Sequence, residues 1–238
     1  MRWIQKKSEP SELIEWRTRC GKDINFGYNL MRQDNCATKA LTEALLKEQG
    51  LLCAYTGMRI DGYVDLHDSR VCHCHLEHVK PQDHCTLDET VSYTNLVACY
   101  PKPNPKSKTP YGAEQKGNWP PPAEQHLFVS PLDSSCETRF LFNLRGEIKP
   151  KEGDQAAATT IQKLALDHHD LTAFRKAAIQ GTLGTQNDLS IKDARKRLKA
   201  LKSNQHRQLE AFCFTLAQVL EKRISKLEVI AKSKRPKK

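Results

Sequence analysis

The sequence lacks an apolar run long enough to cross a membrane, because a spanning helix needs about 20 consecutive apolar residues. Its first residues, with Trp3 followed by Lys6 and Lys7, also lack the apolar core of a signal peptide. No glycine-rich phosphate-binding loop that ends in Gly-Lys-Ser/Thr occurs, so the chain has no ATP-hydrolysing motif. These absences predict a cytoplasmic protein that does not itself supply control by ATP.

Disulfide bonds are also not expected, although the chain has nine cysteines among 238 residues. Thiols stay reduced in the cytoplasm, and the odd count and the close spacing of Cys72 and Cys74 favour metal ligation or burial. A chain of this length can bury a substantial core without disulfides. We expect Cys20, Cys36 and Cys213 to be small buried apolar side chains.

Positive charge is concentrated near the C-terminus. The chain has 38 Lys and Arg against 28 Asp and Glu, a net charge of +10. Residues 191–238 contain 15 of the basic residues and four acids, so they carry +11, whereas residues 1–190 carry −1. A dense cluster of positive charge attracts polyanions. We therefore predict a polyanionic partner such as nucleic acid.

The densest chemical signal is the segment of residues 72–78, which contains three histidines, two cysteines and a glutamate. Alternating residue types, followed by Pro81, predict a strand with His75 and Glu77 on one face. A one-metal nuclease needs a carboxylate that holds a divalent cation and a neutral imidazole that takes a proton from water. Glu77 fits the first role and His78 the second. Adjacent side chains on a strand point to opposite faces, so Glu77 and His78 can act at one site only if the strand ends or bends near His78.

Two segments resemble the signatures of the HNH endonucleases: residues 75–81 (HLEHVKP) and residues 94–99 (TNLVAC), which include the central asparagine. Residues 1–6, 52–55 and 111–117 narrow the resemblance to the PtuB family, the HNH component of the Septu antiphage system. Members of this family are also found as effectors beside some retrons. The resemblance extends from residue 1 to about residue 180.

The resemblance implies an α+β fold with a small ββα-metal catalytic core. It assigns Asn95 to hold the catalytic base His78 in orientation, although a turn-capping asparagine is the simpler interpretation. The expected ligands of a catalytic Mg²⁺ or Mn²⁺ are Glu77, His75 and Glu114, and Glu114 could equally be a surface acid of a short helix. The implied partners are a DNA or RNA substrate, a PtuA-like ATPase and, beside a retron, its reverse transcriptase and nucleic acid.

HNH proteins often carry two pairs of zinc-binding cysteines, and both pairs are incomplete here. Thr56 follows Cys53 where a second cysteine is usual, and Gly112 stands where a partner for Cys99 could fall. A structural Zn²⁺ could still take its ligands from new positions, with simple packing as the rival interpretation. The candidate zinc ligands are Cys53, Cys72, Cys74 and Cys99.

The segment of residues 101–110 contains four prolines and is predicted to be a basic loop beside the site. Its lysines either contact phosphate groups or belong to an ordinary solvated loop. The candidate nucleic-acid contacts are Lys80, Lys102, Lys106, Lys108 and Lys116.

Four regions are expected along the chain. They are an N-terminal helical segment (1–50), with a helix at 38–49; the HNH core (51–120); an accessory β segment (121–153), with strands near 128–131 and 139–144; and a basic helical region (154–238).

In the last region one helix is expected to begin after Asp154 and to carry an apolar stripe from Ile161 to Ala178. His168 and His169 lie on it, either as metal ligands or as an ordinary helix-face pair. Either the N-terminal segment or the amphipathic helices that follow are expected to dock on the ATPase.

Two functions remain open at this level. The first is a metal-dependent HNH endonuclease that hydrolyses phosphodiester bonds in antiphage defence. The second is a non-catalytic, zinc-stabilised nucleic-acid-binding module in which the Cys/His cluster is structural. Both predict affinity for polyanions, so binding alone does not separate them.

Overall fold

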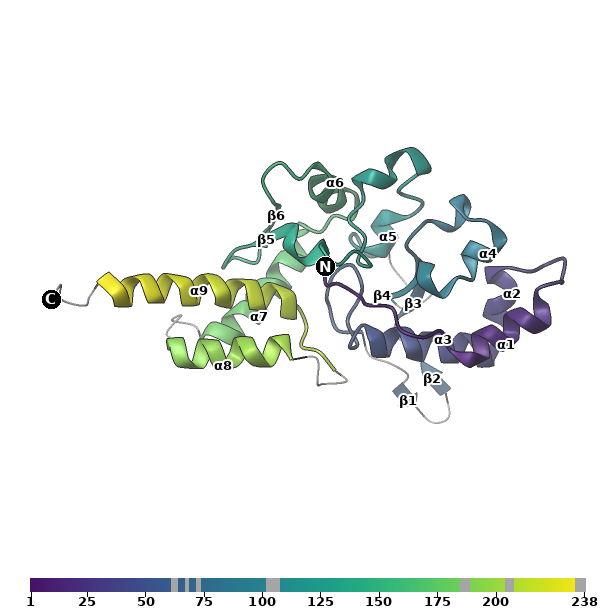
Figure 1. Ribbon diagram of the computed structural model, residues 1–238, viewed down its shortest axis with the longest axis horizontal. Helices are drawn as coiled ribbons and strands as arrows, with labels where there is room; N and C mark the ends of the chain where they lie inside the picture. The colour runs from purple at the N-terminus through teal and green to yellow at the C-terminus, as the bar shows by residue number, and fades with distance from the viewer. Residues whose placement is uncertain are drawn as a thin grey trace.

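The computed structural model of the protein is a mixed α+β fold, and it describes residues 1–60, 64–66, 69–71, 74–101, 108–184, 189–203 and 208–233. Helices α1–α3 and the strand pair β3–β4 lie at one end of the molecule in Figure 1, and α8 and α9 lie at the other end. The α+β class expected from the sequence is therefore confirmed. No helix in these ranges is both long enough and apolar enough to span a membrane.

The N-terminal segment consists of helices α1 (Ser11–Cys20), α2 (Tyr28–Gln33) and α3 (Asn35–Glu48). The helix predicted at 38–49 is confirmed as α3. The Asp34 side chain caps its start by accepting a hydrogen bond from the Ala37 N–H at 2.9 Å, and Leu41 and Leu45 are buried on its inner face. Gly50, with φ of +60°, follows its end in the left-handed conformation that glycine adopts readily.

The described strands form three antiparallel pairs: β1 (Val64–Leu66) with β2 (Ser69–Val71), β3 (His75–His78) with β4 (Leu96–Cys99), and β5 (Phe140–Phe142) with β6 (Ile148–Pro150). In the second pair, Glu77 lies opposite Val97 and His78 lies opposite Leu96. Strand β4 begins only at Leu96, because short helical turns occupy much of residues 82–95. These turns are the 3₁₀ segments Gln82–His84 and Tyr93–Asn95 and helix α4 (Leu87–Thr90).

The outer edge of β4 is covered by side chains instead of by another strand. The buried Gln49 amide donates from Nε2 to the Ala98 carbonyl at 2.8 Å and accepts from the Ala98 N–H at 2.7 Å. Lys6 Nζ donates to the Leu96 carbonyl at 2.6 Å, and the Ala54 N–H also donates to the Ala98 carbonyl. The backbone polar groups on this side of β4 are therefore paired, as buried groups must be.

After helix α5 (Ala113–Lys116), the chain forms the 3₁₀ segments Pro122–Leu127 and Cys136–Thr138 and then the β5–β6 hairpin. The strand expected near 128–131 does not form: the Val129 N–H donates to the Thr160 hydroxyl at 2.8 Å, not to a neighbouring strand. Gly146 at the hairpin turn is necessary, since a Cβ there would lie 2.3 Å from the carbonyl oxygen of Thr172. The hairpin turn therefore packs directly on helix α7.

The C-terminal region contains α6 (Gln155–Lys163), α7 (His169–Leu183), α8 (Ile191–Lys202) and α9 (Cys213–Ser233). Asp154 caps α6 as predicted, but the apolar stripe expected on a single helix is divided between α6 and α7. The break lies at Ala165, which has φ of +45°. Tertiary hydrogen bonds use the carbonyls there: Leu164 accepts from the Gly112 N–H, and Leu166 accepts from the buried Arg175 guanidinium.

Two apolar clusters hold these elements together. One extends from Met1 to Leu171 and therefore includes residues from the first three expected regions and from α6. The other joins α7, α8 and α9, with Leu52 also contributing. All eight described cysteines are free thiols. Cys213 is buried as predicted and Cys20 is partly buried, but Cys36 is exposed at the start of α3, so that prediction was wrong.

Candidate active site

His75 and Glu77 lie on the same face of β3 and contact each other. His75 Nδ1 lies 2.6 Å from the Pro101 carbonyl oxygen, and because a carbonyl can only accept, Nδ1 carries a proton. His75 Nε2 then faces Glu77 Oε2 at 3.8 Å. Burial lowers the pKa of His75, but the hydrogen bonds to Glu77 and Pro101 outweigh it and raise the pKa above its ordinary value. A backbone carbonyl thus directs the second ring nitrogen of His75 at the carboxylate.

The other oxygen of Glu77 is held by a buried lysine. Lys116 Nζ lies 2.9 Å from Glu77 Oε1 and 2.9 Å from the His78 carbonyl oxygen, and only 1% of the Lys116 side chain is exposed. The Tyr55 hydroxyl also donates to Oε1, at 3.4 Å. Burial raises the pKa of Glu77, but the hydrogen bond from His75 and the charge of Lys116 hold the pKa below its usual value. Glu77 is therefore ionised and fixed in position near neutral pH.

His78 has partners different from those of Glu77, as alternation along a strand requires. His78 Nε2 lies 2.8 Å from the Thr90 carbonyl oxygen, so Nε2 carries the proton and Nδ1 has a free lone pair when the ring is neutral. The Tyr28 ring packs against the imidazole edge with 4.6 Å between ring centroids. Burial lowers the pKa of His78. The strand ends at His78, as the sequence argument required, and a bend follows at Val79 and Lys80.

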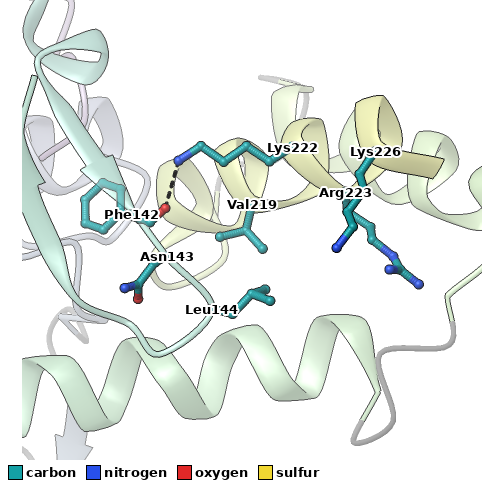
Figure 2. Close-up of a pocket in the computed structure, with 7 residues that line it drawn as sticks. All are labelled: Phe142, Asn143, Leu144, Val219, Lys222, Arg223 and Lys226. Carbon is teal, nitrogen blue, oxygen red and sulfur yellow. Dashed lines mark hydrogen bonds between the residues drawn. The ribbon is translucent and has the colours of Figure 1, made fainter. Parts of the chain in front are cut away.

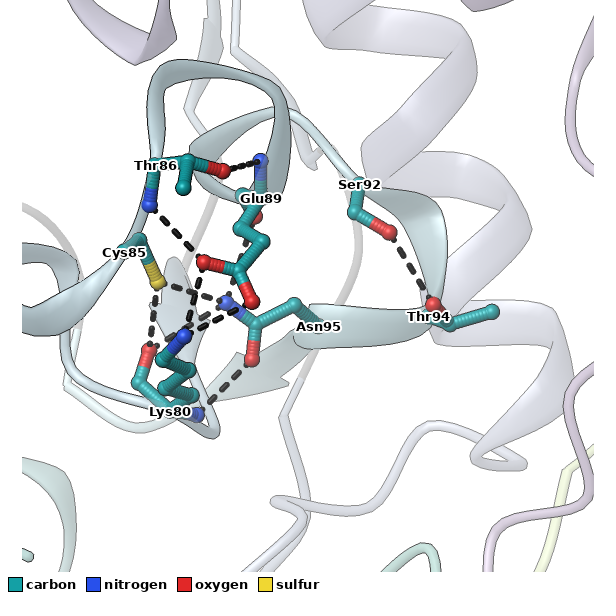
Figure 3. Close-up of polar contacts among 7 residues, drawn as sticks. All are labelled: Lys80, Cys85, Thr86, Glu89, Ser92, Thr94 and Asn95. Atoms are coloured by element: carbon teal, nitrogen blue, oxygen red, sulfur yellow. Dashed lines mark hydrogen bonds and ion pairs between the residues drawn. The ribbon is translucent and has the colours of Figure 1, made fainter. Parts of the chain in front are cut away.

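Asn95 connects the end of β3 to helix α4 (Figure 3). Its Oδ1 accepts from the Lys80 N–H at 2.8 Å, and its Nδ2 donates to the carbonyl oxygens of Lys80 and Glu89 at 3.2 and 3.3 Å. Glu89 immediately precedes Thr90, whose carbonyl accepts from His78. Asn95 is therefore a cross-link between two segments, not an isolated turn cap.

The lysines predicted to contact phosphate lie in different settings. Lys116 is buried on Glu77 and does not face solvent, which departs from the prediction. Lys80 Nζ lies 2.7 Å from each carboxylate oxygen of Glu89, while Lys108 is exposed. Lys102 and Lys106 lie outside the described residues. The acid predicted as a third metal ligand, Glu114, accepts a hydrogen bond from the Thr109 N–H.

The positions discussed as zinc ligands converge, but they do not carry four thiols. Cys53 is hydrogen-bonded to Cys99 and to Thr56. A Cβ at Gly112 would lie 3.2 Å from Thr56 Cγ2, so Gly112 adjoins the same cluster. Burial raises the pKa of Cys99 well above its ordinary value, which keeps that group a thiol. Cys74 is buried, and Cys72 lies outside the described residues.

Within the ranges that the structure describes, one group of three or more potential metal donors has its ligand atoms within 4.8 Å of one another: His168, His169 and Asp170. His168 caps helix α7, because its Nδ1 accepts from the Asp170 N–H at 3.3 Å. That lone pair is thus already used, and the positive end of a helix dipole disfavours a cation. The His169 side chain is 84% exposed. This arrangement agrees with an ordinary helix-end pair.

Helix α8 carries cations of two kinds. Arg195, Arg197 and Lys202 form ion pairs with the acids Glu228, Glu210 and Glu221. Lys192, Lys196 and Lys199 recur at four- and three-residue spacing, which places them on one helix face, and all three are exposed. Among the described residues these three make no ion pair, so much of the free positive charge of the C-terminal region lies on this face.

A separate pocket of about 260 Å³ lies between the β5–β6 hairpin and α9 (Figure 2). Phe142, Leu144 and Val219 form its apolar wall, and Lys222, Arg223 and Lys226 line it from α9. Lys222 Nζ donates to the Phe142 carbonyl at 2.9 Å and so ties the helix to the hairpin. The pocket has no acid or nucleophile among its lining residues, so it offers no second hydrolytic site.

Sequence reasoning identified His75, Glu77, His78 and Asn95 but not the groups that orient them. Thr90 and Pro101 act through backbone carbonyls, which every residue has, so residue type gave no signal. Tyr28 lies 50 residues before His78, and its contact depends on how α2 packs. No protein-family model and no curated protein matches this chain. Its function is therefore inferred from the chemistry around β3.

Proposed function

We propose that the protein is a metal-dependent endonuclease of the HNH type, in which β3, β4 and α5 form a ββα catalytic core that hydrolyses phosphodiester bonds in DNA or RNA. The observation that carries this proposal is the setting of His78. The Thr90 carbonyl accepts a hydrogen bond from Nε2–H, and burial lowers the pKa of His78, so the ring is neutral near pH 7 with its lone pair on Nδ1. A neutral imidazole with a defined tautomer is suited to act as a general base.

In the proposed reaction, His78 Nδ1 takes a proton from a water molecule while the water oxygen forms a bond to phosphorus and the bond from phosphorus to the leaving sugar oxygen breaks. The leaving oxygen departs with the electron pair of that bond and takes a proton from solvent. The imidazole then carries a positive charge, and the Thr90 carbonyl stabilises that charge by accepting from Nε2–H. Asn95 holds the Lys80 and Glu89 backbones together and so keeps the Thr90 carbonyl in place. Asn95 is thus a positioning residue in this proposal.

The two donors that precede His78 on β3, His75 and Glu77, suit a hard divalent cation. Glu77 Oε2 and His75 Nε2 lie 3.8 Å apart on one face of β3. His75 could hold a cation through Nε2 once that nitrogen gives up the proton it directs at Glu77, while Nδ1–H stays hydrogen-bonded to the Pro101 carbonyl. Mg²⁺ and Mn²⁺ keep several waters and often take only one or two protein ligands. Such a cation would stabilise charge on the phosphoryl and leaving oxygens. Lys116 keeps Glu77 ionised, and Glu114 is not required as a ligand.

The biological setting belongs to the same proposal. We propose that the enzyme acts in the cytoplasm in antiphage defence together with a PtuA-like ATPase and, in a retron setting, with the reverse transcriptase and its nucleic acid. The resemblance of residues 1–180 to the PtuB family supports this setting. The unpaired lysine face of α8 supports a nucleic-acid partner because it supplies charge that is not neutralised within the described chain.

The alternative, a non-catalytic zinc-stabilised nucleic-acid-binding module, has less support. Thr56 and Gly112 occupy two of the four positions that converge near Cys53, and neither side chain supplies a thiolate. A structural zinc site normally has four strong ligands. A buried, neutral His78 held by a carbonyl also has no obvious purpose in a purely structural module.

The direct test is His78→Ala, with cleavage measured on plasmid DNA, single-stranded DNA and transfer RNA in Mg²⁺ or Mn²⁺, with and without the ATPase. Loss of a general base should reduce the rate by roughly 10²–10⁴-fold. The matched control is His126→Ala, which removes an exposed histidine outside the site and should leave the rate unchanged. Far-ultraviolet circular dichroism and zinc content should be the same in both variants. Absence of cleavage in the parent, together with unfolding of His78→Ala and loss of zinc, would favour the structural module.

The pH dependence gives a second test of His78. Because its pKa is lowered, the base-competent neutral form persists below the ordinary histidine pKa of about 6.5. The cleavage rate should therefore rise with pH, with a midpoint below that value, and then reach a plateau. A pH–rate profile of the parent enzyme would contradict the assignment if the midpoint lay above the ordinary value.

A further inference from the structure

A second concave surface adjoins His78. It is a groove of about 490 Å³ between residues 24–33, on one side, and Gln82 with α4 on the other. Tyr28 and Thr90 line this groove, and both also contact His78: Tyr28 through its ring and Thr90 through its carbonyl oxygen. These two residues would therefore separate a ligand in this groove from the proposed catalytic base.

The polar groups of this groove are amides. Asn25, Asn29, Gln33 and Gln82 all line it and are all exposed. Among the described residues, no side-chain amide of these four is hydrogen-bonded to another protein group. Each amide offers two N–H donors and one carbonyl acceptor. Eight donors and four acceptors are thus directed to solvent or to a ligand.

The remaining lining is apolar, and none of the described lining residues is charged. Ile24 is 95% exposed and Leu87 is 60% exposed, so two large apolar side chains stand open at the groove. Phe26 also lines it, with its ring stacked on Trp16 at 5.4 Å between centroids. A flat ligand with apolar faces and hydrogen-bonding edges matches this combination.

We propose that this groove binds an unpaired nucleobase of the substrate strand. Amide side chains recognise base edges through paired hydrogen bonds, and apolar side chains provide faces on which a base can stack. The uncharged lining selects the base over the phosphate. Arg32, which follows in α2 and forms no ion pair within the described chain, would contact a flanking phosphate. This inference rests on the proposed nuclease function and makes its substrate single-stranded at the site of cleavage.

The test compares two short fluorescein-labelled single-stranded oligonucleotides of equal length, one with bases and one fully abasic. Their phosphate charge is the same, so any difference in binding reports contacts with bases. Binding of the full chain is followed by fluorescence anisotropy in EDTA, so that cleavage cannot interfere. The base-bearing strand should bind about tenfold or more tightly, since each stacked base contributes about 1–3 kcal/mol.

The variant Asn29→Ala/Gln33→Ala should reduce that difference, because it removes hydrogen bonds to the base edge, and should leave affinity for the abasic strand unchanged. The matched control, Gln162→Ala/Gln180→Ala, removes two exposed amides from α6 and α7 and should retain the full difference. Equal binding of the two strands by the parent protein would overturn the proposal. The proposal would also fail if the groove variant bound both strands equally more weakly than the parent protein. It would fail as well if neither strand bound at low salt, and the groove would then be assigned to a protein partner.

Cleavage by the same preparations separates this inference from the proposed function. If the parent protein discriminates bases but never cleaves with Mg²⁺ or Mn²⁺, the groove assignment stands and the nuclease assignment fails. If it cleaves but does not discriminate bases, the nuclease assignment stands and the groove assignment fails.

Discussion

Around β3 the charged side chains pair in the interior, whereas between α8 and α9 they pair at the surface. The exposed fractions are 1% for Lys116 and 16% for Glu77, against 58% for Lys202 and 44% for Glu221. Both pairs join a lysine to a glutamate across a long stretch of sequence. They therefore differ mainly in how far water screens the charges.

This difference in solvation gives the two pairs different roles. Removing one partner of a buried pair leaves the other charge without water or a counterion, which is strongly destabilising. An exposed pair can exchange its partner for water at little cost. The interior pair around β3 therefore fixes a geometry, while the surface pairs of α8 and α9 add little to the stability of the fold.

The largest expected effect comes from removing the buried lysine. Lys116→Met leaves the Glu77 carboxylate buried beside a neutral side chain and should lower the free energy of unfolding by about 3–5 kcal/mol. It should also raise the pKa of Glu77, because one of the groups that lowers this pKa is lost. Urea denaturation at neutral pH gives the change in stability.

The matched control makes the same substitution in the surface pair. Lys202→Met should change the free energy of unfolding by less than about 1 kcal/mol. If Lys116→Met and Lys202→Met lowered the free energy of unfolding equally, burial would not explain a difference between the two ion pairs.

Asn95→Ala should have an intermediate effect. It leaves the Lys80 N–H without its acceptor, and an unsatisfied buried group costs about 1–3 kcal/mol. The Lys80 and Glu89 carbonyls lose one donor each but still accept from Cys85 Sγ and from the Ser92 N–H.

The control for this variant is Asn143→Ala at the exposed β5–β6 turn. It removes hydrogen bonds that Asn143 Oδ1 accepts from the Arg145 and Glu147 N–H groups, and water can replace them. Thermal unfolding reports stability, and the cleavage rate should fall in Asn95→Ala alone. Unchanged cleavage in a folded Asn95→Ala variant would remove this residue from the positioning role.

The smallest expected effect concerns the pair that joins α8 to α9 through Arg195 and Glu228. A double-mutant cycle with Arg195→Met and Glu228→Gln should give a coupling energy below about 1 kcal/mol. Raising the salt concentration should reduce it further, because surface charges are screened. A coupling as large as the loss expected for Lys116→Met would show that this pair holds the two helices together.

Much of the helical structure could be predicted because its signals are local. Asp154 was predicted to cap a helix, and α6 begins immediately after it. The helix predicted at 38–49 is likewise present as α3. The division of the stripe between α6 and α7 could not be predicted, since the break at Ala165 depends on partners far along the chain. The Gly112 N–H and the Arg175 guanidinium bind carbonyls on either side of it.

The candidate site was predictable in its residue types but not in its contacts. The segment around Glu77 and His78 stood out because residue types that can bind a metal or act as a base were concentrated there. The prediction for Lys116 was wrong: it was expected to contact phosphate, yet it is buried and forms an ion pair with Glu77. Sequence pattern places a lysine on the surface by default, because burying one is costly unless an acid meets it. Only the packing of α5 against β3 supplies that acid.

The covered edge of β4 has a consequence for self-association. An open strand edge is a template on which another chain can add a strand, and such growth leads to aggregates. Gln49 and Lys6 already occupy the hydrogen-bonding groups on that side of β4, so an incoming strand would find no unpaired donor or acceptor at Ala98. β4 can thus remain the last strand on its side of this two-stranded sheet, because Gln49 blocks the addition of another strand there.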